Sequence, residues 1–168
     1  MTAQRKIAFE LGGKYRVKDR FEAVGGVAAN VSCGLARFGY RVASYSCIGK
    51  DEIGRYVLDA FRAEGVATEF LTEYSDAKTD LSSIIVMTQN GERTIFHNRD
   101  ANERLVVRKE SLKRADWLFV SALNGEWRKN VDTILEAKTA YGMQLALNPG
   151  QHNIKEDAEK MLTLLPSV

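Results

Sequence analysis

The sequence contains few of the residues on which several common kinds of protein depend. Among its 168 residues, two are cysteines (Cys33 and Cys47) and two are histidines (His97 and His152). Two cysteines cannot build the disulfide framework of a small secreted domain, so we expect buried free thiols in a cytoplasmic protein, with one disulfide as the alternative. The histidines lack an i,i+4 partner or a nearby cysteine pair, so their spacing supports no metal site. No Ser-His-Asp arrangement stands out either, although spacing alone does not exclude one.

The sequence also lacks an excess of charge of one sign and any long apolar run. Its 24 lysines and arginines nearly balance 22 aspartates and glutamates, which leaves a net charge of +2. This balance gives no reason to expect a nucleic-acid partner or an acidic membrane surface. No run is long enough to span a membrane, and the N-terminus lacks the apolar core of a signal peptide. With 45% apolar and 27% charged residues, the composition predicts one soluble globular domain.

Two common nucleotide-binding motifs are absent. A phosphate-binding loop of the Walker A type would need a glycine five residues before Gly49, where the sequence has Ser44. It would also need Ser or Thr after Lys50, where the sequence has Asp51. No Gly-x-Gly-x-x-Gly occurs, so a nicotinamide site is not supported.

Residues 24–54 hold the most informative pattern in the chain. A glycine pair precedes a helical pattern that ends at Gly39, and the apolar positions on one face of this helix are Val27, Val31, Leu35 and Phe38. A strand over residues 42–48 follows, and Asp51 is placed to cap a helix over 52–64. This order of elements is typical of an α/β domain that binds a polar ligand near a helix N-terminus.

The rest of the chain continues this alternation. We expect strands over residues 7–11, 14–21, 68–73, 81–87, 93–98, 117–121 and 143–147, and helices over 112–115, 127–141 and 156–165. Asn90-Gly91 predicts a type I′ turn between two strands of a hairpin. Residues 121–124 and 148–150 would follow buried parallel strands, at the sheet edge where α/β domains bind ligands, although 148–150 could equally be a simple turn.

Residues 14–21 alternate strictly between basic and other side chains. Lys14, Arg16, Lys18 and Arg20 would share one face of a strand. The simpler interpretation is a half-exposed strand with a solvated basic face. The alternative is a lid strand that lies near an anionic ligand.

Several short motifs occur together in a fixed order. They are Gly-Gly-x-x-x-Asn at 25–30, Leu-Ala-Arg-Phe-Gly at 35–39, Ile-Gly-x-Asp-x-x-Gly at 48–54 and Glu-Gly-Val at 64–66, with weaker matches at 101–105 and 147–150. This series resembles the first signature of the PfkB/ribokinase family of carbohydrate and nucleoside kinases. The resemblance implies a ribokinase-like three-layer α/β sandwich with a mostly parallel sheet and helices on both faces. It also implies a small β lid from residues 7–21 and 80–98, through which two copies could pair.

The resemblance suggests which residues bind the substrate. Gly25 and Gly26 would let backbone approach a sugar, and Asn30 would bond its hydroxyls, since a carboxamide both donates and accepts. The alternative for Asn30 is a helix-face asparagine bonded to nearby backbone. Arg99 and Asn102 would lie at the rim of the site, unless they belong to an ordinary polar loop. Some relatives carry an acidic sugar ligand near residues 122–124, where this chain has Ala-Leu-Asn, so the identity of the sugar or nucleoside is left open.

Other parts of the family pattern are absent from the sequence. The motif Asp-Thr-x-Gly-Ala-Gly-Asp, whose last aspartate serves as the base and whose glycines form the anion hole, does not occur. The first strand, with its substrate-binding aspartate, and the ATP-binding half are also missing. We therefore expect residues 1–168 to form a single partial domain that binds substrate and has no catalytic residue of its own. ATP and Mg²⁺ would serve the full-length family, with no tight binding to this chain.

Three hypotheses follow. The chain is part of a PfkB-type kinase, or it is a non-catalytic half-protein that binds a sugar or nucleoside, or it is an unrelated doubly wound ligand-binding domain.

Overall fold

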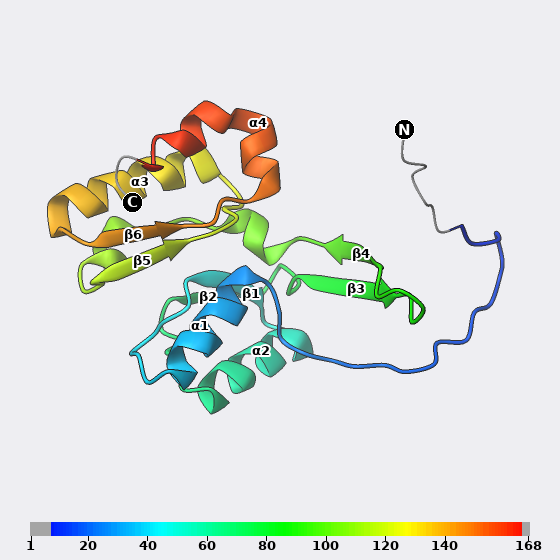
Figure 1. Cartoon of the computed structure of the whole chain (residues 1–168). Helices are drawn as coiled ribbons and strands as arrows, with labels where there is room; N and C mark the ends of the chain where they lie inside the picture. The colour runs from blue at the N-terminus through cyan, green and yellow to red at the C-terminus, as the bar shows by residue number, and fades with distance from the viewer. Residues whose placement is uncertain (1–7, 166–168) are drawn as a thin grey trace.

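The first half of the domain consists of two helices and two parallel strands. The computed structural model describes residues 8–165. In it, α1 (Val27–Arg37), β1 (Ser46–Gly49), α2 (Glu52–Ala63) and β2 (Leu71–Tyr74) follow one another (Figure 1). β1 pairs in parallel with β2, with Ser46 opposite Leu71. The helices and strands expected over this stretch are confirmed, although both strands are shorter than predicted.

The second half repeats the parallel arrangement. β5 (Trp117–Val120) and β6 (Gln144–Leu147) are parallel, and α3 (Trp127–Tyr141) connects them. α3 has the predicted bounds and ends directly before Gly142. α4 (Gln151–Leu162) begins earlier than the predicted residue 156. The prediction missed this start because α4 contains a break at Asp157, whose carboxylate accepts a hydrogen bond from Lys160 N–H and so caps the last turns.

A hairpin projects between these two halves (Figure 1). β3 (Leu81–Val86) and β4 (Arg93–Asn98) are antiparallel, with Leu81 opposite Asn98 and Val86 opposite Arg93. The predicted type I′ turn is wrong. That turn needs positive φ at both central residues, but only Gly91 has it, with φ 73°. Met87 N–H donates to the Glu92 carbonyl and so continues the pairing of the strands, which leaves residues 88–91 as the connecting loop, longer than the two-residue loop of a type I′ hairpin.

The N-terminal segment differs from the prediction. Within residues 8–25 no strand forms, so the strands expected over 7–11 and 14–21 are not present in the described part, and Ile7 lies outside it. Alternation alone cannot make a strand without a neighbour to hydrogen-bond it. That this segment belongs to a lid stays a prediction. The short helix expected over 112–115 is a 3₁₀ helix, η2 (Lys109–Leu112), and another, η1 (Ala101–Arg104), follows the hairpin.

The parallel strands do not join into one sheet. In residues 8–165 they form two separate two-stranded sheets, where the sequence predicted one mostly parallel sheet. Side chains satisfy the edge of β1 that faces away from β2. Cys47 N–H donates to Asn102 Oδ1 at 3.0 Å and Gly49 N–H donates to Thr79 Oγ1 at 2.9 Å. These two N–H groups therefore need no further strand.

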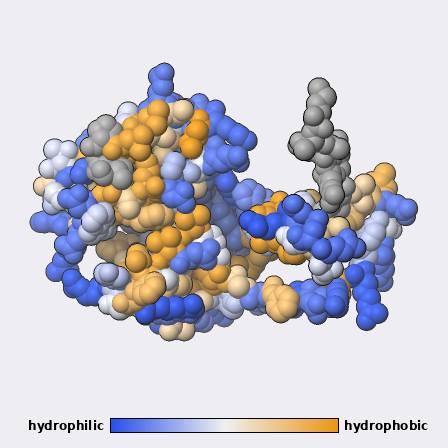
Figure 2. Space-filling view, in the orientation of Figure 1, coloured by the Kyte–Doolittle hydropathy of each residue, from blue (hydrophilic) through white to orange (hydrophobic). Residues whose placement is uncertain are grey.

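The main hydrophobic core lies between the second sheet and its helices. Its most deeply buried members are each at most 1% exposed, namely Ala101, Val131, Ile134, Ala137, Met143 and Leu164. The hairpin lies outside this core. Five of its large hydrophobic side chains are more than half exposed, namely Leu81, Ile84, Val86, Ile95 and Phe96. Figure 2 shows hydrophobic surface both on the compact part and on the projecting part of the molecule. None of the helices in residues 8–165 has the length and apolar character needed to cross a membrane.

Asp51 caps α2 as the sequence predicted, and it also fixes the start of the hairpin. Its carboxylate accepts hydrogen bonds from Gly54 N–H at 2.8 Å, Thr79 N–H at 2.9 Å and Thr79 Oγ1–H at 2.7 Å. Burial tends to raise the pKa of the Asp51 carboxyl, but these hydrogen bonds outweigh burial and hold the pKa below its ordinary value of 3.8. Asp51 therefore stabilises the fold in its ionised form.

This pKa shift predicts a pH-dependent contribution to stability. Because the pKa is lower in the folded chain, the contribution of Asp51 is present above the ordinary pKa and is lost as the pH falls through the folded pKa. The difference in unfolding free energy between the wild type and Asp51→Asn should therefore shrink between about pH 5 and about pH 2. Urea unfolding at several pH values measures it, and a difference that does not change with pH would contradict the prediction.

Candidate functional site

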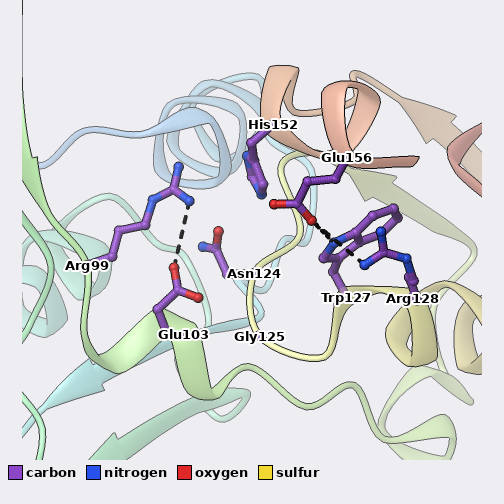
Figure 3. A pocket seen from close by; sticks show the side chains of 8 residues that line it. All are labelled: Arg99, Glu103, Asn124, Gly125, Trp127, Arg128, His152 and Glu156. Carbon is purple, nitrogen blue, oxygen red and sulfur yellow. Dashed lines mark hydrogen bonds and ion pairs between the residues drawn. The ribbon is translucent and has the colours of Figure 1, made fainter. Parts of the chain in front are cut away.

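A polar cavity lies beside the loop that follows β5 (Figure 3). Its volume is about 190 Å³. The lining comes from the end of the hairpin and η1, from the loop between β5 and α3, and from the starts of α3 and α4. The residues are Arg99, Glu103, Asn124, Gly125, Trp127, Arg128, His152 and Glu156. The carboxyl end of a parallel strand is where α/β domains place their ligands, so this position agrees with the prediction for residues 121–124.

Opposite charges line two sides of the cavity. On one side, the guanidinium of Arg99 lies 3.7 Å from the Glu103 carboxylate. On the other, Glu156 accepts a hydrogen bond from Trp127 Nε1–H at 2.9 Å and lies 3.8 Å from the guanidinium of Arg128. That guanidinium also stacks over the Trp127 ring, 4.4 Å from its centre. The cavity thus offers both hydrogen-bond donors and acceptors, with no single sign of charge.

Three side chains hold the loop at residues 121–126. Asn153 is fully buried; its Oδ1 accepts from Leu123 N–H at 3.2 Å and its Nδ2 donates to the Leu123 carbonyl at 2.8 Å. Asn130 Nδ2 donates to the carbonyl of Asn124 at 3.3 Å. His152 Nε2 lies 3.0 Å from the Leu123 carbonyl. Because a carbonyl only accepts, Nε2 carries the proton, and a neutral His152 ring has its Nδ1 left as an acceptor.

Asn124 presents an unsatisfied acceptor. Its Oδ1 atom is buried, and none of residues 8–165 donates a hydrogen bond to it. A buried acceptor without a partner costs free energy, and unsatisfied groups of this kind mark places where a ligand or a water can bind. Figure 3 shows the Asn124 side chain between Arg99 on one side and His152 on the other. The arrangement suits a ligand with hydroxyl groups, which both donate and accept.

The structure separates the five residues predicted from the sequence. Arg99 lines the cavity, whereas Gly25, Gly26, Asn30 and Asn102 do not. Gly25 and Gly26 precede α1, and Asn30 lies exposed in its first turns. Asn102 lies beside β1, where its side chain bonds to Ser46 Oγ, Cys47 N–H and Asp80.

Sequence reasoning did not single out Glu103, Trp127, Arg128, His152 or Glu156. Only the position at the carboxyl end of β5 pointed toward them. No spacing rule connects residues 99–103 with residues 152–156, because it is the tertiary fold that brings these stretches together.

Comparison with known proteins extends these observations. The sequence matches the pfkB family of carbohydrate kinases over residues 4–168. It is 31% identical over 151 residues to the ribokinase of Haemophilus influenzae, covering 85% of this chain and 47% of that protein. It is 32% identical over 104 residues to the fructokinase of Vibrio alginolyticus, covering 60% and 33%. Among solved structures, the ribokinase from Giardia lamblia has a TM-score of 0.69 at 23% identity, covering 82% of this chain and 44% of that one.

Parallel strands, connecting helices and a polar cavity beyond the end of β5 define an α/β domain of the kind that binds small molecules. Because the family match spans nearly the whole sequence, the chain belongs to the pfkB family of carbohydrate kinases, and its fold is ribokinase-like. The resemblance noted in the sequence is confirmed, and the alternative of an unrelated doubly wound domain is overturned. The chain spans about half, or less, of the length of these relatives.

Proposed function

We propose that this chain is the substrate-binding part of a pfkB-type carbohydrate kinase that uses ATP to phosphorylate a hydroxyl group of a sugar or nucleoside. The observation that carries this proposal is the cavity beyond β5, in a chain of this family. There a buried, unsatisfied Asn124 Oδ1 lies among charged donors and acceptors. A polyhydroxylated ligand would satisfy Asn124 by donating a hydroxyl proton, and its oxygens would accept from the Arg99 guanidinium. A non-catalytic half-protein that binds the same ligand is the second candidate, and it rests on the same cavity.

In residues 8–165 no group of three His, Cys, Asp or Glu side chains is placed to hold a metal ion. The sequence also lacks the Asp-Thr-x-Gly-Ala-Gly-Asp motif that supplies the base in the family. We expect a purified chain to show no ATP-dependent phosphorylation of any sugar in a coupled assay. Catalysis that is lost in Asn30→Ala would contradict this expectation.

The contacts support different roles for the predicted substrate ligands. Asn30 is exposed, and its side chain makes no hydrogen bond within residues 8–165, which leaves its carboxamide available to a ligand. We propose that Asn30 bonds substrate hydroxyls beside the glycine pair Gly25-Gly26. We propose that Arg99 contacts the substrate from the cavity side. Asn102 as a substrate ligand stays a prediction, and because its carboxamide is occupied within the chain we infer a different role for it below. A cytoplasmic location and pairing of two copies through the lid also stay predictions.

Calorimetric titration with pentoses, hexoses, nucleosides and ATP tests the proposal. We expect one sugar or nucleoside to bind, and we expect Arg99→Ala to weaken its binding by about tenfold or more, because a hydrogen bond to a charged group contributes on the order of 1.5–3 kcal/mol. Arg114→Ala is the matched control, because Arg114 is exposed and precedes β5, at the opposite end of the strand from the cavity. Absence of binding by every ligand, or equal binding by Arg99→Ala and the wild type, would overturn the proposal.

A further inference from the structure

The orientation of the projecting hairpin is set at its root. Its outer side chains are exposed along both strands, and in Figure 1 the hairpin extends away from the helices and sheets. Residues 76–80 lead into β3, and residues 99–102 lead out of β4. A hairpin with so little packing along its length depends on these two connections for its position.

Asp80 binds the two connections to each other. Its Oδ1 accepts from Asp100 N–H at 2.9 Å and from Asn102 N–H at 3.3 Å, and its Oδ2 accepts from Asn102 Nδ2 at 3.1 Å. Lys78 adds two further bonds. Its N–H donates to Asp100 Oδ2 at 2.7 Å, and its carbonyl accepts from Ala101 N–H at 3.1 Å. No lysine or arginine in residues 8–165 pairs with Asp80, so backbone and amide N–H groups alone hold its carboxylate.

Asn102 binds the connections to the body of the domain. While its Nδ2 donates to Asp80, its Oδ1 accepts from Ser46 Oγ at 2.8 Å and from Cys47 N–H at 3.0 Å. Both partners belong to β1, and Cys47 N–H lies on the edge of β1 that faces away from β2. The carboxamide therefore joins the hairpin root to a strand, and each of its two polar atoms has a partner of the correct kind.

We propose that Asp80 and Asn102 are positioning residues that lock the hairpin root to β1 and thereby fix Arg99 at the cavity. Arg99 lies between the end of β4 and Asp100. The clamp formed by Asp80 and Asn102 holds Asp100 and therefore limits the movement of the Arg99 backbone. The part of this inference that makes Arg99 a ligand contact rests on the proposed function. The clamp itself does not.

The donor and acceptor pattern of the clamp allows a swap experiment. Asp80→Asn replaces one acceptor oxygen by an NH₂ group, which must then face an N–H of residue 100 or 102 or the amide of Asn102. Asn102→Asp places two carboxylates against each other. The double swap, Asp80→Asn with Asn102→Asp, restores one donor and one acceptor between the side chains and leaves acceptors for Ser46 and Cys47. Each single substitution should therefore loosen the hairpin root, and the double substitution should restore its rigidity.

The distance between two spin labels measures this directly. One label is attached to a cysteine that replaces Gln89 in the hairpin loop, and the other to a cysteine that replaces Ala63 in α2; both positions are exposed. The native cysteines are removed by Cys33→Ser and Cys47→Ala. In the absence of ligand we expect each single variant to broaden the distance distribution about twofold, since the root is then free to open locally. The double swap should return it to the original width. Asp76→Asn is the matched control, because it removes the ion pair between Asp76 and Arg104 in the same root but changes neither Asp80 nor Asn102.

Unchanged widths in the singles, or singles that broaden without rescue in the double, would overturn the clamp. If a single variant does not fold, hydrogen exchange of the unaltered chain tests the clamp instead. Protection of the amides of Lys78, Asp100 and Asn102 to the same degree as those of β1 would support the clamp. Exchange of these amides at the rate of an unfolded chain would refute it. Because no ligand enters these measurements, their failure is distinct from a failure of the sugar titration.

Discussion

Replacing Gly54 by alanine is expected to destabilise the chain by about 2–5 kcal/mol, because the new side chain has no space. A Cβ atom at this position would lie 2.1 Å from the Gly49 carbonyl oxygen and 2.9 Å from Thr79 Oγ1. The nearer contact is with backbone, which cannot turn away as a flexible side chain can. It would push α2 from the end of β1 and break the hydrogen bond from Gly54 N–H to Asp51. The midpoint of urea unfolding measures the loss.

Gly34→Ala is the matched control for this prediction. Gly34 lies inside α1, and an added Cβ there meets nothing within 4 Å. The same change should therefore stabilise the chain by about 0.5–1 kcal/mol, because alanine loses less backbone entropy in a helix than glycine does. A Gly54→Ala variant as stable as the wild type would show that α2 can move away from β1 at little cost.

Gly49 and Gly54 show what a sequence motif can mean in physical terms. Gly49, Asp51 and Gly54 were noted as part of a family signature, and nothing in their spacing says whether they bind a ligand or support the fold. The structure shows close backbone contact at both glycines and a carboxylate that caps α2. In this chain the signature at residues 48–54 therefore has a structural role.

The elements best predicted from the sequence are α2, α3 and the strands β3 to β6, whose bounds all lie within one residue of the prediction. α2 has Asp51 as its cap and a clear apolar stripe, and α3 ends at a glycine; both were placed within one residue. The strand predicted over residues 14–21 does not form, because a strand needs a hydrogen-bonded partner and alternation of side chains does not supply one. α4 was placed late because its cap at Asp157 is internal, and an internal cap looks like a start.

The candidate site was predictable only in part for a related reason. Arg99 was found because it follows a hairpin strand at a position that the resemblance marked. His152 and Glu156 lie in a helix whose start was missed, and no local pattern relates them to Arg99. Asn102 was found as a polar residue in a loop, but its role depends on β1, which lies more than fifty residues earlier in the chain.

Asn153→Ala is expected to destabilise the chain by about 2–4 kcal/mol, because it leaves buried backbone groups unsatisfied and opens a small cavity. Asn153 is 0% exposed and bonds both the N–H and the carbonyl of Leu123. After the change, the carbonyl keeps only His152 as a partner, and the N–H loses its only side-chain acceptor in residues 8–165. Thermal and urea unfolding measure the loss.

The same change should also weaken ligand binding, since Asn153 holds the loop that presents Asn124 to the cavity. Asn30→Ala separates the two effects. It removes the same atoms from an exposed helix position with no side-chain hydrogen bond in the described residues, so stability should stay equal or rise by about 0.5 kcal/mol. If both variants lose sugar binding but only Asn153→Ala loses stability, Asn30 acts on the ligand directly and Asn153 acts through the loop. Equal stability of Asn153→Ala and the wild type would mean that water replaces the carboxamide, and that α4 does not fix the loop.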